Sequence, residues 1–196
     1  MRNVLCSFIF WATFAQAGAG FAQTMASAPS APPAHEIDVA FMYSSQGRQG
    51  TGGNTFWAQG GSVELSADVY RGFGVAVDFT VGHASNMNGS GINLTTFTPT
   101  VGPRYTWSHR KLSIFGEGLV GVSDASSGIF PAAGGAQMTA RSFAAQVGGG
   151  VDLHLSSHIA VRPIEASWLR TQFPNGTTNV QNTLQLGAGV VFRLQH

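Results

Sequence analysis

The sequence predicts an all-β protein, an eight-stranded antiparallel up-and-down transmembrane β-barrel, and three observations support this fold class. Hydrophobic and polar residues alternate along eight segments after residue 36, which is typical of strands with one apolar face. The connections between these segments are alternately short and long, as in outer-membrane barrels. Charged residues make up only 10% of the chain, against roughly 25% in an ordinary soluble domain.

Residues 1–22 have the organisation of a signal peptide. Arg2 precedes an apolar run over residues 4–15, and Gly20 and Ala22 supply the small residues of a cleavage site. The apolar run is shorter than the roughly 20 residues that a membrane-spanning helix needs. We therefore expect an exported protein that is cleaved after Ala22.

The rest of the chain is expected to form a disordered lead-in over residues 23–35, rich in Pro, Ala and Ser, and one barrel domain over residues 36–196. The only cysteine, Cys6, lies in the signal peptide, which excludes disulfides, thiolate catalysis and cysteine-ligated metals from the mature chain. Loss of Arg2 leaves nine Lys+Arg against nine Asp+Glu. This neutral balance does not favour nucleic-acid binding.

The eight segments differ in how clearly they alternate. In the third, Phe73, Val75, Val77, Phe79 and Val81 alternate with small or polar residues. Successive side chains of a strand point to opposite faces, so this segment has one apolar face for lipid and one polar face for the lumen. The expected strands cover residues 37–43, 57–70, 73–82, 97–107, 112–123, 142–154, 158–171 and 180–194.

The connections assign the two ends of the barrel. Tight turns are expected at residues 70–72, 108–110 and 155–157, on the periplasmic side. Longer, glycine-rich connections, such as residues 45–55 and 124–139, are expected to be external loops. An even number of strands returns both termini to the periplasmic side.

The charged residues of the strands fall on the polar face. An Arg or Lys that faces lipid at mid-membrane costs about 2–4 kcal/mol. Eight strands leave room in the lumen only for side chains, so opposite charges should pair across it. Arg162 and Glu165 can both face inward only if a bulge interrupts their strand near Pro163. We expect a cross-lumen charge network of Arg104, Glu117, Arg162 and Glu165.

A series of short motifs in fixed order carries a family resemblance. The motifs are His83-Ala84-Ser85-Asn86, Gly102-Pro103-Arg104-Tyr105, Phe115-Gly116-Glu117 with Gly121, Gly148-Gly149-Gly150-Val151-Asp152, Ala160-Val161-Arg162, and Gln181-Asn182 to Gly189-Val190-Val191-Phe192-Arg193. With them the chain resembles the small bacterial outer-membrane β-barrel family, which is related to the OmpA-like transmembrane domain and often called porin-like. The resemblance implies a barrel in the outer membrane of a Gram-negative bacterium, usually of unassigned function.

The motif His83-Ala84-Ser85-Asn86 offers an alternative of another class. It resembles the His-x-Ser-Asn motif of the lipid A 3-O-deacylases, in which a His activates a Ser and a Glu orients the His. This chain has Asn93 where that family carries its Glu, and Asp78 points to the face opposite His83. A further alternative is a soluble lipid-binding barrel, whose surface would be unusually poor in Lys and Glu.

The sequence therefore predicts a non-enzymatic outer-membrane barrel with a filled lumen and a structural or surface-interaction role through its external loops. No catalytic, cofactor-binding or metal-ligating residue is assigned. His154 and His158 straddle a turn at a spacing that suits a helix, not a hairpin, so a metal site there is not expected. The expected partners are outer-membrane lipids and an unidentified loop ligand, and the expected state is a monomer.

Overall fold

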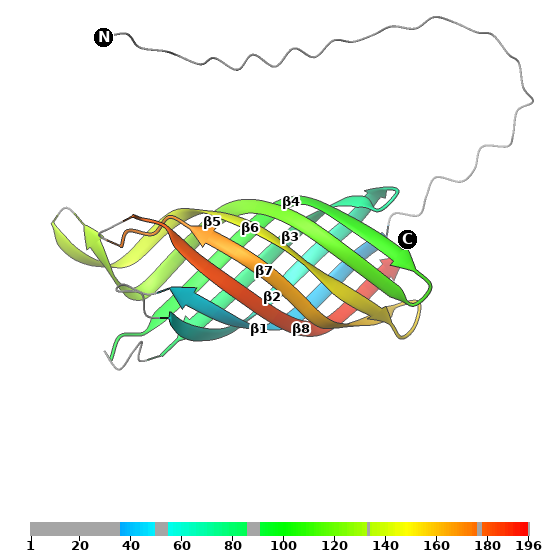
Figure 1. The fold of residues 1–196 in the computed structure, drawn as a ribbon, viewed down its shortest axis with the longest axis horizontal. Coiled ribbons are helices and arrows are strands. Elements are labelled where there is room, and N and C mark those ends of the chain that lie inside the picture. The colour runs from blue at the N-terminus through cyan, green and yellow to red at the C-terminus, as the bar shows by residue number, and fades with distance from the viewer. Residues whose placement is uncertain (1–35, 50–54, 86–90, 133, 176–177, 196) are drawn as a thin grey trace, which may run out of the picture. The chain divides into compact units, whose positions relative to one another are not determined.

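A computed structural model of the chain describes residues 36–85, except 50–54, and 91–195, except 133 and 176–177. The predicted signal peptide over 1–22 and lead-in over 23–35 lie outside the described residues. Eight strands close into a barrel in which each strand pairs antiparallel with the next (Figure 1). They are β1 (Glu36–Gln49), β2 (Thr55–Tyr70), β3 (Phe73–Ala84), β4 (Leu94–His109), β5 (Leu112–Ala132), β6 (Gly135–His154), β7 (Ile159–Thr171) and β8 (Gln181–Gln195).

The barrel is closed by pairing between its first and last strands. The register runs from Glu36 opposite Gln195 to Arg48 opposite Thr183, so the start of β1 and the end of β8 meet at one end of the barrel (Figure 1). The tight turns lie at this same end, which we call the turn end; the opposite end is the loop end. The predicted fold class is thus confirmed, and β1 begins and β8 ends at the end of the barrel that carries the tight turns.

The three tight turns occur where the sequence predicts them. Between β2 and β3, Arg71 and Gly72 have φ values of 49° and 83°, the mirror-image turn that matches the twist of paired strands. A Cβ atom on Gly72 would lie 2.2 Å from the carbonyl oxygen of Thr106. The amide of Thr106 donates a 2.7 Å hydrogen bond to the Gly72 carbonyl, so glycine lets β4 approach this turn.

One predicted external loop is wrong. Most of the segment 124–139 is strand, because β5 continues to Ala132 and β6 begins at Gly135. The two strands stay paired beyond a bulge between Ser126 and Phe130. Alternation of apolar and polar residues predicts a strand only where the two faces of the strand meet different surroundings. The Ser126-Ser127-Gly128 stretch has no such alternation, so the sequence does not predict a strand there.

The predicted loop over residues 45–55 is also too long. Strand β1 extends to Gln49 and β2 begins at Thr55, and their register continues to the pair Gln49 opposite Thr55. Polar residues and glycine occupy the end of β1, so the sequence there reads as a loop although the backbone is paired.

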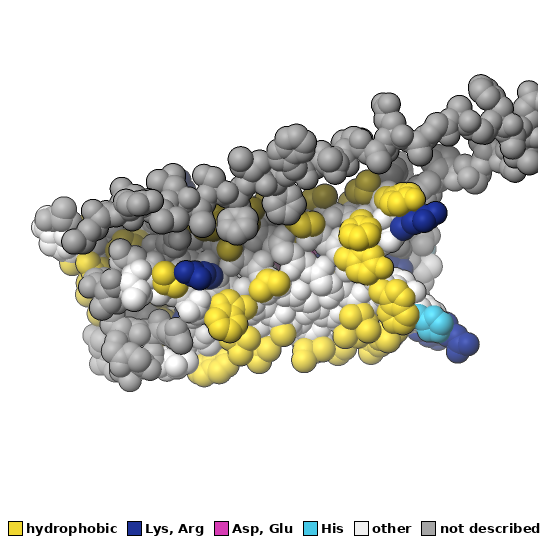
Figure 2. Space-filling view, turned by 45° about the horizontal axis from the view of Figure 1, so that its top comes forward, with side chains coloured by type: hydrophobic (Ala, Val, Ile, Leu, Met, Phe, Trp, Pro, Cys, Tyr) yellow, Lys and Arg dark blue, Asp and Glu magenta, His cyan; other side chains and the backbone are white. Residues whose placement is uncertain are grey.

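The barrel carries its apolar side chains on the outside. Outward residues such as Phe73, Val147 and Trp168 are 55–64% exposed, while the inward positions are mainly polar or small. Figure 2 shows hydrophobic side chains along the barrel wall, His and Lys or Arg side chains at its right-hand end, and a further Lys or Arg side chain toward its left-hand end. This orientation is opposite to that of the soluble lipid-binding alternative, in which the apolar face would surround a ligand.

No helix in the described part of the chain is long and apolar enough to cross a membrane.

The bulge predicted near Pro163 is present. The register of β7 with β8 shifts between Arg162 and Glu165. On a regular strand these two residues would face opposite sides. The shift turns both side chains inward, where they form an ion pair of 2.6 Å.

Candidate functional site

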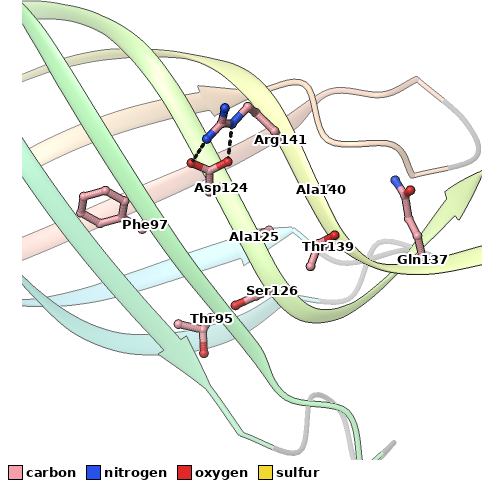
Figure 3. Close-up of a pocket in the computed structure, with 9 residues that line it drawn as sticks. All are labelled: Thr95, Phe97, Asp124, Ala125, Ser126, Gln137, Thr139, Ala140 and Arg141. Atoms are coloured by element: carbon pink, nitrogen blue, oxygen red, sulfur yellow. Dashed lines mark hydrogen bonds and ion pairs between the residues drawn. The ribbon is translucent and has the colours of Figure 1, made fainter.

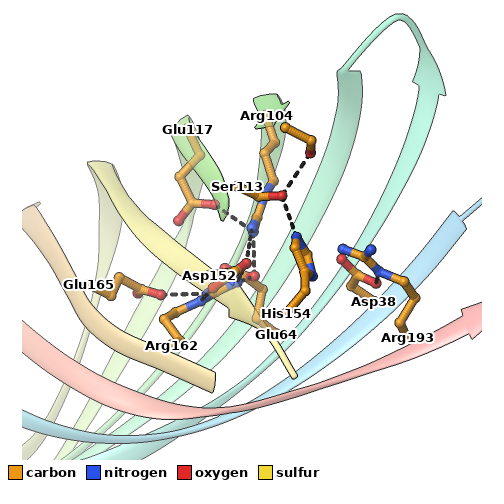
Figure 4. A network of polar contacts seen from close by, with 11 residues as sticks. Asp38, Glu64, Arg104, Ser113, Glu117, Asp152, His154, Arg162, Glu165 and Arg193 are labelled. Carbon is orange, nitrogen blue, oxygen red and sulfur yellow. Dashed lines mark hydrogen bonds and ion pairs between the residues drawn. The ribbon is translucent and has the colours of Figure 1, made fainter. Parts of the chain in front are cut away.

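The lumen contains a buried network of ion pairs centred on Arg162 (Figure 4). The side chain of Arg162 has no solvent exposure. Its Nε and Nη2 donate to the two carboxylate oxygens of Asp152 at 2.7 and 3.1 Å, the fork geometry that suits a guanidinium and a carboxylate. Its Nη1 donates to Glu165 at 2.6 Å and to Glu64 at 3.1 Å. Because Glu64 lies on β2 and Arg162 on β7, this contact crosses the lumen.

Arg104 of β4 connects the same carboxylates from another side. Its Nη1 donates to Glu64, and more weakly to Glu117 at 3.5 Å, and its Nη2 lies 3.8 Å from Asp152. The side chain of Arg104 is 3% exposed. Two arginines on opposite parts of the wall therefore share Glu64 and Asp152.

Phe115 supports both guanidinium groups. The Cζ atoms of Arg104 and Arg162 lie 3.5 and 4.2 Å from the centroid of its ring. A guanidinium within about 6 Å of an aromatic centroid gains a cation–π attraction, which is larger away from water. The ring and the ion pairs together fill the middle of the lumen.

The four residues of the predicted network come together as expected. The alternation of residues also places Glu64 and Asp152 on the inward face, but the sequence does not predict that they belong to this network. Parity shows which way a side chain points, but its cross-lumen partners depend on strand register and tilt. Only the closed barrel brings Glu64 beside both arginines.

Acidic residues outnumber basic ones in this part of the lumen. One carboxylate oxygen each of Glu64, Glu117 and Glu165 lie within 4.8 Å of one another. Glu64 and Glu165 are bound by the arginines, whereas Oε1 of Glu117 is buried without a hydrogen-bond partner. Asp78, also buried, accepts a hydrogen bond from Thr80 at 2.5 Å. Glu64 is therefore shared by both arginines and Glu165 is paired with Arg162, which makes this group an ion-pair network.

The turn end of the lumen holds a second polar group. Arg193 donates to Asp38 at 3.3 Å, and Ser113 contacts Nε2 of His154 at 2.7 Å. His158 instead contacts the hydroxyl of Ser157 at 2.8 Å. The two histidines thus have different partners.

Toward the loop end, each strand carries one outward polar residue that limits the apolar band. We call this set the polar rim. Aromatic residues of the neighbouring strands donate to two of its members: Tyr43 to Gln59 at 2.7 Å, and Trp168 to Asn182 at 3.2 Å. The rim lies on the loop-end side of the apolar band. Its members are Ser45, Gln59, His83, Thr95, Asp124, Arg141, Arg170 and Asn182.

His83 belongs to this rim. Its Nδ1 lies 2.9 Å from the hydroxyl of Thr95, and Ser85 is exposed, while Asn86 lies outside the described residues. Asp78 points into the lumen and is buried, as predicted for the opposite face. Within the described part of the chain, His83 contacts no carboxylate, so the structure shows no acid that could orient it as in a deacylase site.

A groove of about 490 Å³ lies where the rim crosses β4, β5 and β6 (Figure 3). Arg141 and Asp124 form a two-bond ion pair at 2.5 and 2.9 Å on one side of it. Phe97, Thr139 and Gln137 are among its other lining residues. The ion pair joins β5 to β6 at the base of the hairpin that these strands form.

A hydrophobic cluster holds that hairpin, which we define as residues 124–141. Phe130 of the hairpin packs against Phe173, with ring centroids 5.7 Å apart. Ala125 and Ala140 complete the cluster, and Leu94 packs against it. The opposite side of the hairpin exposes Ile129 and Met138, at 60% and 68%. One apolar side of the hairpin is therefore packed in the cluster, and the other apolar side is exposed.

Comparisons with known proteins agree with this geometry. The sequence model of a family described as "Outer membrane protein beta-barrel domain" matches residues 12–192. No curated protein sequence matches the chain.

Solved structures with a similar fold include Neisserial surface protein A, with a TM-score of 0.64 and 13% identity over 80% of this chain and 96% of that one. Another is Ail, the attachment invasion locus protein of Yersinia pestis, in complex with the heparin analogue sucrose octasulfate. It has a TM-score of 0.56 and 15% identity over 82% of this chain and 99% of that one. At these identities the likeness shows the fold alone.

Proposed function

This chain belongs to the family of outer-membrane β-barrel domains, and on that premise we propose that it is a non-enzymatic barrel that displays a rigid hairpin at the bacterial surface. The proposal follows the orientation usual for such barrels, with tight turns in the periplasm and longer connections outside. The hairpin of β5 and β6 lies at the loop end (Figure 1), so it would face the exterior of a Gram-negative cell.

The observation that carries this proposal is the support of the hairpin by its own hydrophobic cluster. Phe130 and Phe173 are 6% and 2% exposed, although they lie beyond the apolar band. An ordered binding element loses less conformational entropy on binding than a flexible loop. The exposed Ile129 and Met138 favour contact with a protein surface, since exposed apolar side chains of this kind contribute to protein interfaces.

The polyanion bound by Ail in its solved complex is not the ligand that we propose here. The hairpin has no Lys or Arg between Asp124 and Ala140, and its Arg141 is already paired with Asp124. A sulfated polysaccharide requires several accessible cations. A protein partner suits the uncharged hairpin better.

Adhesion of cells that display the protein tests this proposal. We expect adherence to at least one coat among immobilised collagen, fibronectin and serum albumin, and its loss in the double variant Ile129→Asp, Met138→Asp. The variant Arg170→Gln, which changes the polar rim and leaves the hairpin intact, is the matched control and should adhere. Equal adherence of wild type and double variant to every coat would contradict the proposal.

The non-enzymatic part of the proposal has its own test. The contacts of His83 support it, because the imidazole lacks a described carboxylate to fix its tautomer. Mass spectrometry of lipid A from cells expressing the protein should show no loss of an acyl chain. A loss that disappears in Ser85→Ala would instead establish deacylase activity.

A further inference from the structure

Arg48 is a buried arginine without an acidic partner. It is the penultimate residue of β1 at the loop end, and it is 8% exposed. The other two buried arginines, Arg104 and Arg162, each bind several carboxylates. Arg48 Nη2 instead donates to two neutral oxygens, Gln46 Oε1 and Thr96 Oγ1, each at 2.6 Å.

The carboxylates that the structure describes lie elsewhere. Of its nine Asp and Glu residues, eight have described side chains, and none of these eight forms an ion pair with Arg48. The ninth, Glu36, begins the same strand at the turn end. It is twelve residues from Arg48, or about 40 Å at roughly 3.3 Å per residue. Among the carboxylates whose side chains the structure describes, none therefore neutralises Arg48.

The guanidinium also has an unused donor. Nε of Arg48 is buried and has no hydrogen-bond partner. A buried cation that is neither paired with an anion nor fully hydrogen-bonded is strongly unfavourable. An anion at this place would supply both the missing charge and the missing acceptor.

The wall of the barrel is shaped to hold this arginine. A Cβ atom on Gly82 of β3 would lie 2.4 Å from Gln46 Oε1 and 3.1 Å from Arg48 Nη2. Glycine at position 82 thus leaves the space that the side chains of Gln46 and Arg48 occupy as they extend from β1 toward β3. Deeper on the same inward face of β3 is Asp78, whose charge would oppose the passage of an anion toward the turn end.

We propose that Arg48 binds a free inorganic oxyanion, phosphate or sulfate, which enters from the loop end. The planar donor fork of a guanidinium fits the paired oxygens of such anions better than it fits a spherical ion. The low exposure of Arg48 favours a small free anion over a phosphate group attached to a lipid or glycan. The site is separate from the outer surface of the hairpin, and it does not depend on the proposed adhesive function.

Anion-dependent unfolding of the full chain, refolded in detergent micelles, tests the site. The unfolding midpoint is followed by tryptophan fluorescence while sodium sulfate replaces sodium chloride at constant ionic strength. We expect a saturable rise of the midpoint in wild type, because a ligand that binds only the folded state stabilises it. The rise should be absent in Arg48→Met and present in Arg170→Met, which removes an exposed arginine of the polar rim. A wild type without a saturable rise, or an equal rise in Arg48→Met, would overturn the proposal.

The stability of the variant in chloride gives an independent result. Removal of an unpaired buried cation should not destabilise the barrel, so Arg48→Met should unfold at a midpoint equal to or above that of wild type. A clearly lower unfolding midpoint for Arg48→Met than for wild type in chloride would contradict the absence of an acidic partner for Arg48. If Arg48→Met does not fold, phosphorus NMR of wild type decides: inorganic phosphate should show saturable line broadening that sulfate reverses, and its absence would overturn the site.

Discussion

Arg162 depends on one local irregularity of the backbone. The bulge between Arg162 and Glu165 turns both residues inward, and the guanidinium then contacts three carboxylates on three strands. Its opposite position on β8 is Gly189, which places no side chain in the lumen. A single extra residue in the strand therefore gives a cation to a group of acids that would otherwise repel one another.

Replacement of Arg162 is expected to destabilise the barrel severely. In Arg162→Gln, the acids Glu64, Asp152 and Glu165 lose a shared cation, and removal of one partner from a buried pair costs about 3–5 kcal/mol. Urea unfolding in lipid bilayers, followed by tryptophan fluorescence, measures this loss. Arg170→Gln is the exposed control and should change stability by less than about 1 kcal/mol. Equal stabilities of the two variants would show that the network does not stabilise the fold.

Glu117 should respond differently, although it belongs to the same network. Among the described residues its hydrogen-bond donor is Arg104 Nη1, 3.5 Å from its Oε2, and its Oε1 has no partner. Glu117→Gln removes one negative charge from an acid-rich group and keeps the shape of the side chain. We expect it to unfold at a urea concentration close to or above that of wild type. A loss as large as that of Arg162→Gln would show that Glu117 is an essential ion-pair partner.

At the scale of strands, the sequence is informative where the two faces of a strand meet different surroundings. The apolar parity of Phe73–Val81 predicts β3 because one face meets lipid and the other meets the lumen. The hairpin over 124–141 lacks this contrast, so its strands could not be read from alternation. Its cluster depends on Phe173, which is 43 positions from Phe130 and comes close only in the folded barrel.

The hairpin should loosen when its cluster is opened. Phe130→Ala removes the ring that packs on Phe173, and large-to-small changes in a core commonly cost about 3–5 kcal/mol. We expect the loss to be local, with faster hydrogen exchange and proteolysis over the hairpin and unchanged protection of β1, β2 and β8. Ile129→Ala, on the exposed side of the same hairpin, is the control and should leave both rates unchanged. Uniform loss of protection around the barrel would contradict a separate outer cluster.

At the scale of the whole molecule, the barrel is apolar outside and polar inside. Its outward apolar band ends at the polar rim, and its inward face carries the ion pairs of Arg104 and Arg162. The sequence predicts this division, because the division depends only on the alternation of apolar and polar residues along each strand and on the positions of the turns. The particular partners inside the lumen could not be predicted, since contacts such as Glu64 with Arg162 join strands that do not pair with each other.

The depth of the apolar band can be measured with an introduced charge. Val147 is 64% exposed on the outward face near the middle of β6. Val147→Arg should lower the free energy of unfolding in bilayers by about 2–4 kcal/mol, because the charge would face hydrocarbon. Gln172→Arg, just beyond the end of β7, should cost no more than about 1 kcal/mol. Similar losses at both positions would contradict a membrane band that ends at the polar rim.

The purified barrel should not conduct ions through steady pores of porin size. Arg104, Arg162 and Phe115 are buried in mid-lumen and contact one another across it, and an eight-stranded barrel is just wide enough for side chains to fill. Current recordings in planar bilayers, with a porin reconstituted under the same conditions as positive control, should show no long-lived steps of the control's size. Phe115→Ala removes the ring between the two guanidiniums but leaves the ion pairs, so it too should remain non-conducting at that scale. Steady porin-sized steps from the wild-type protein would mean that the network leaves the lumen open.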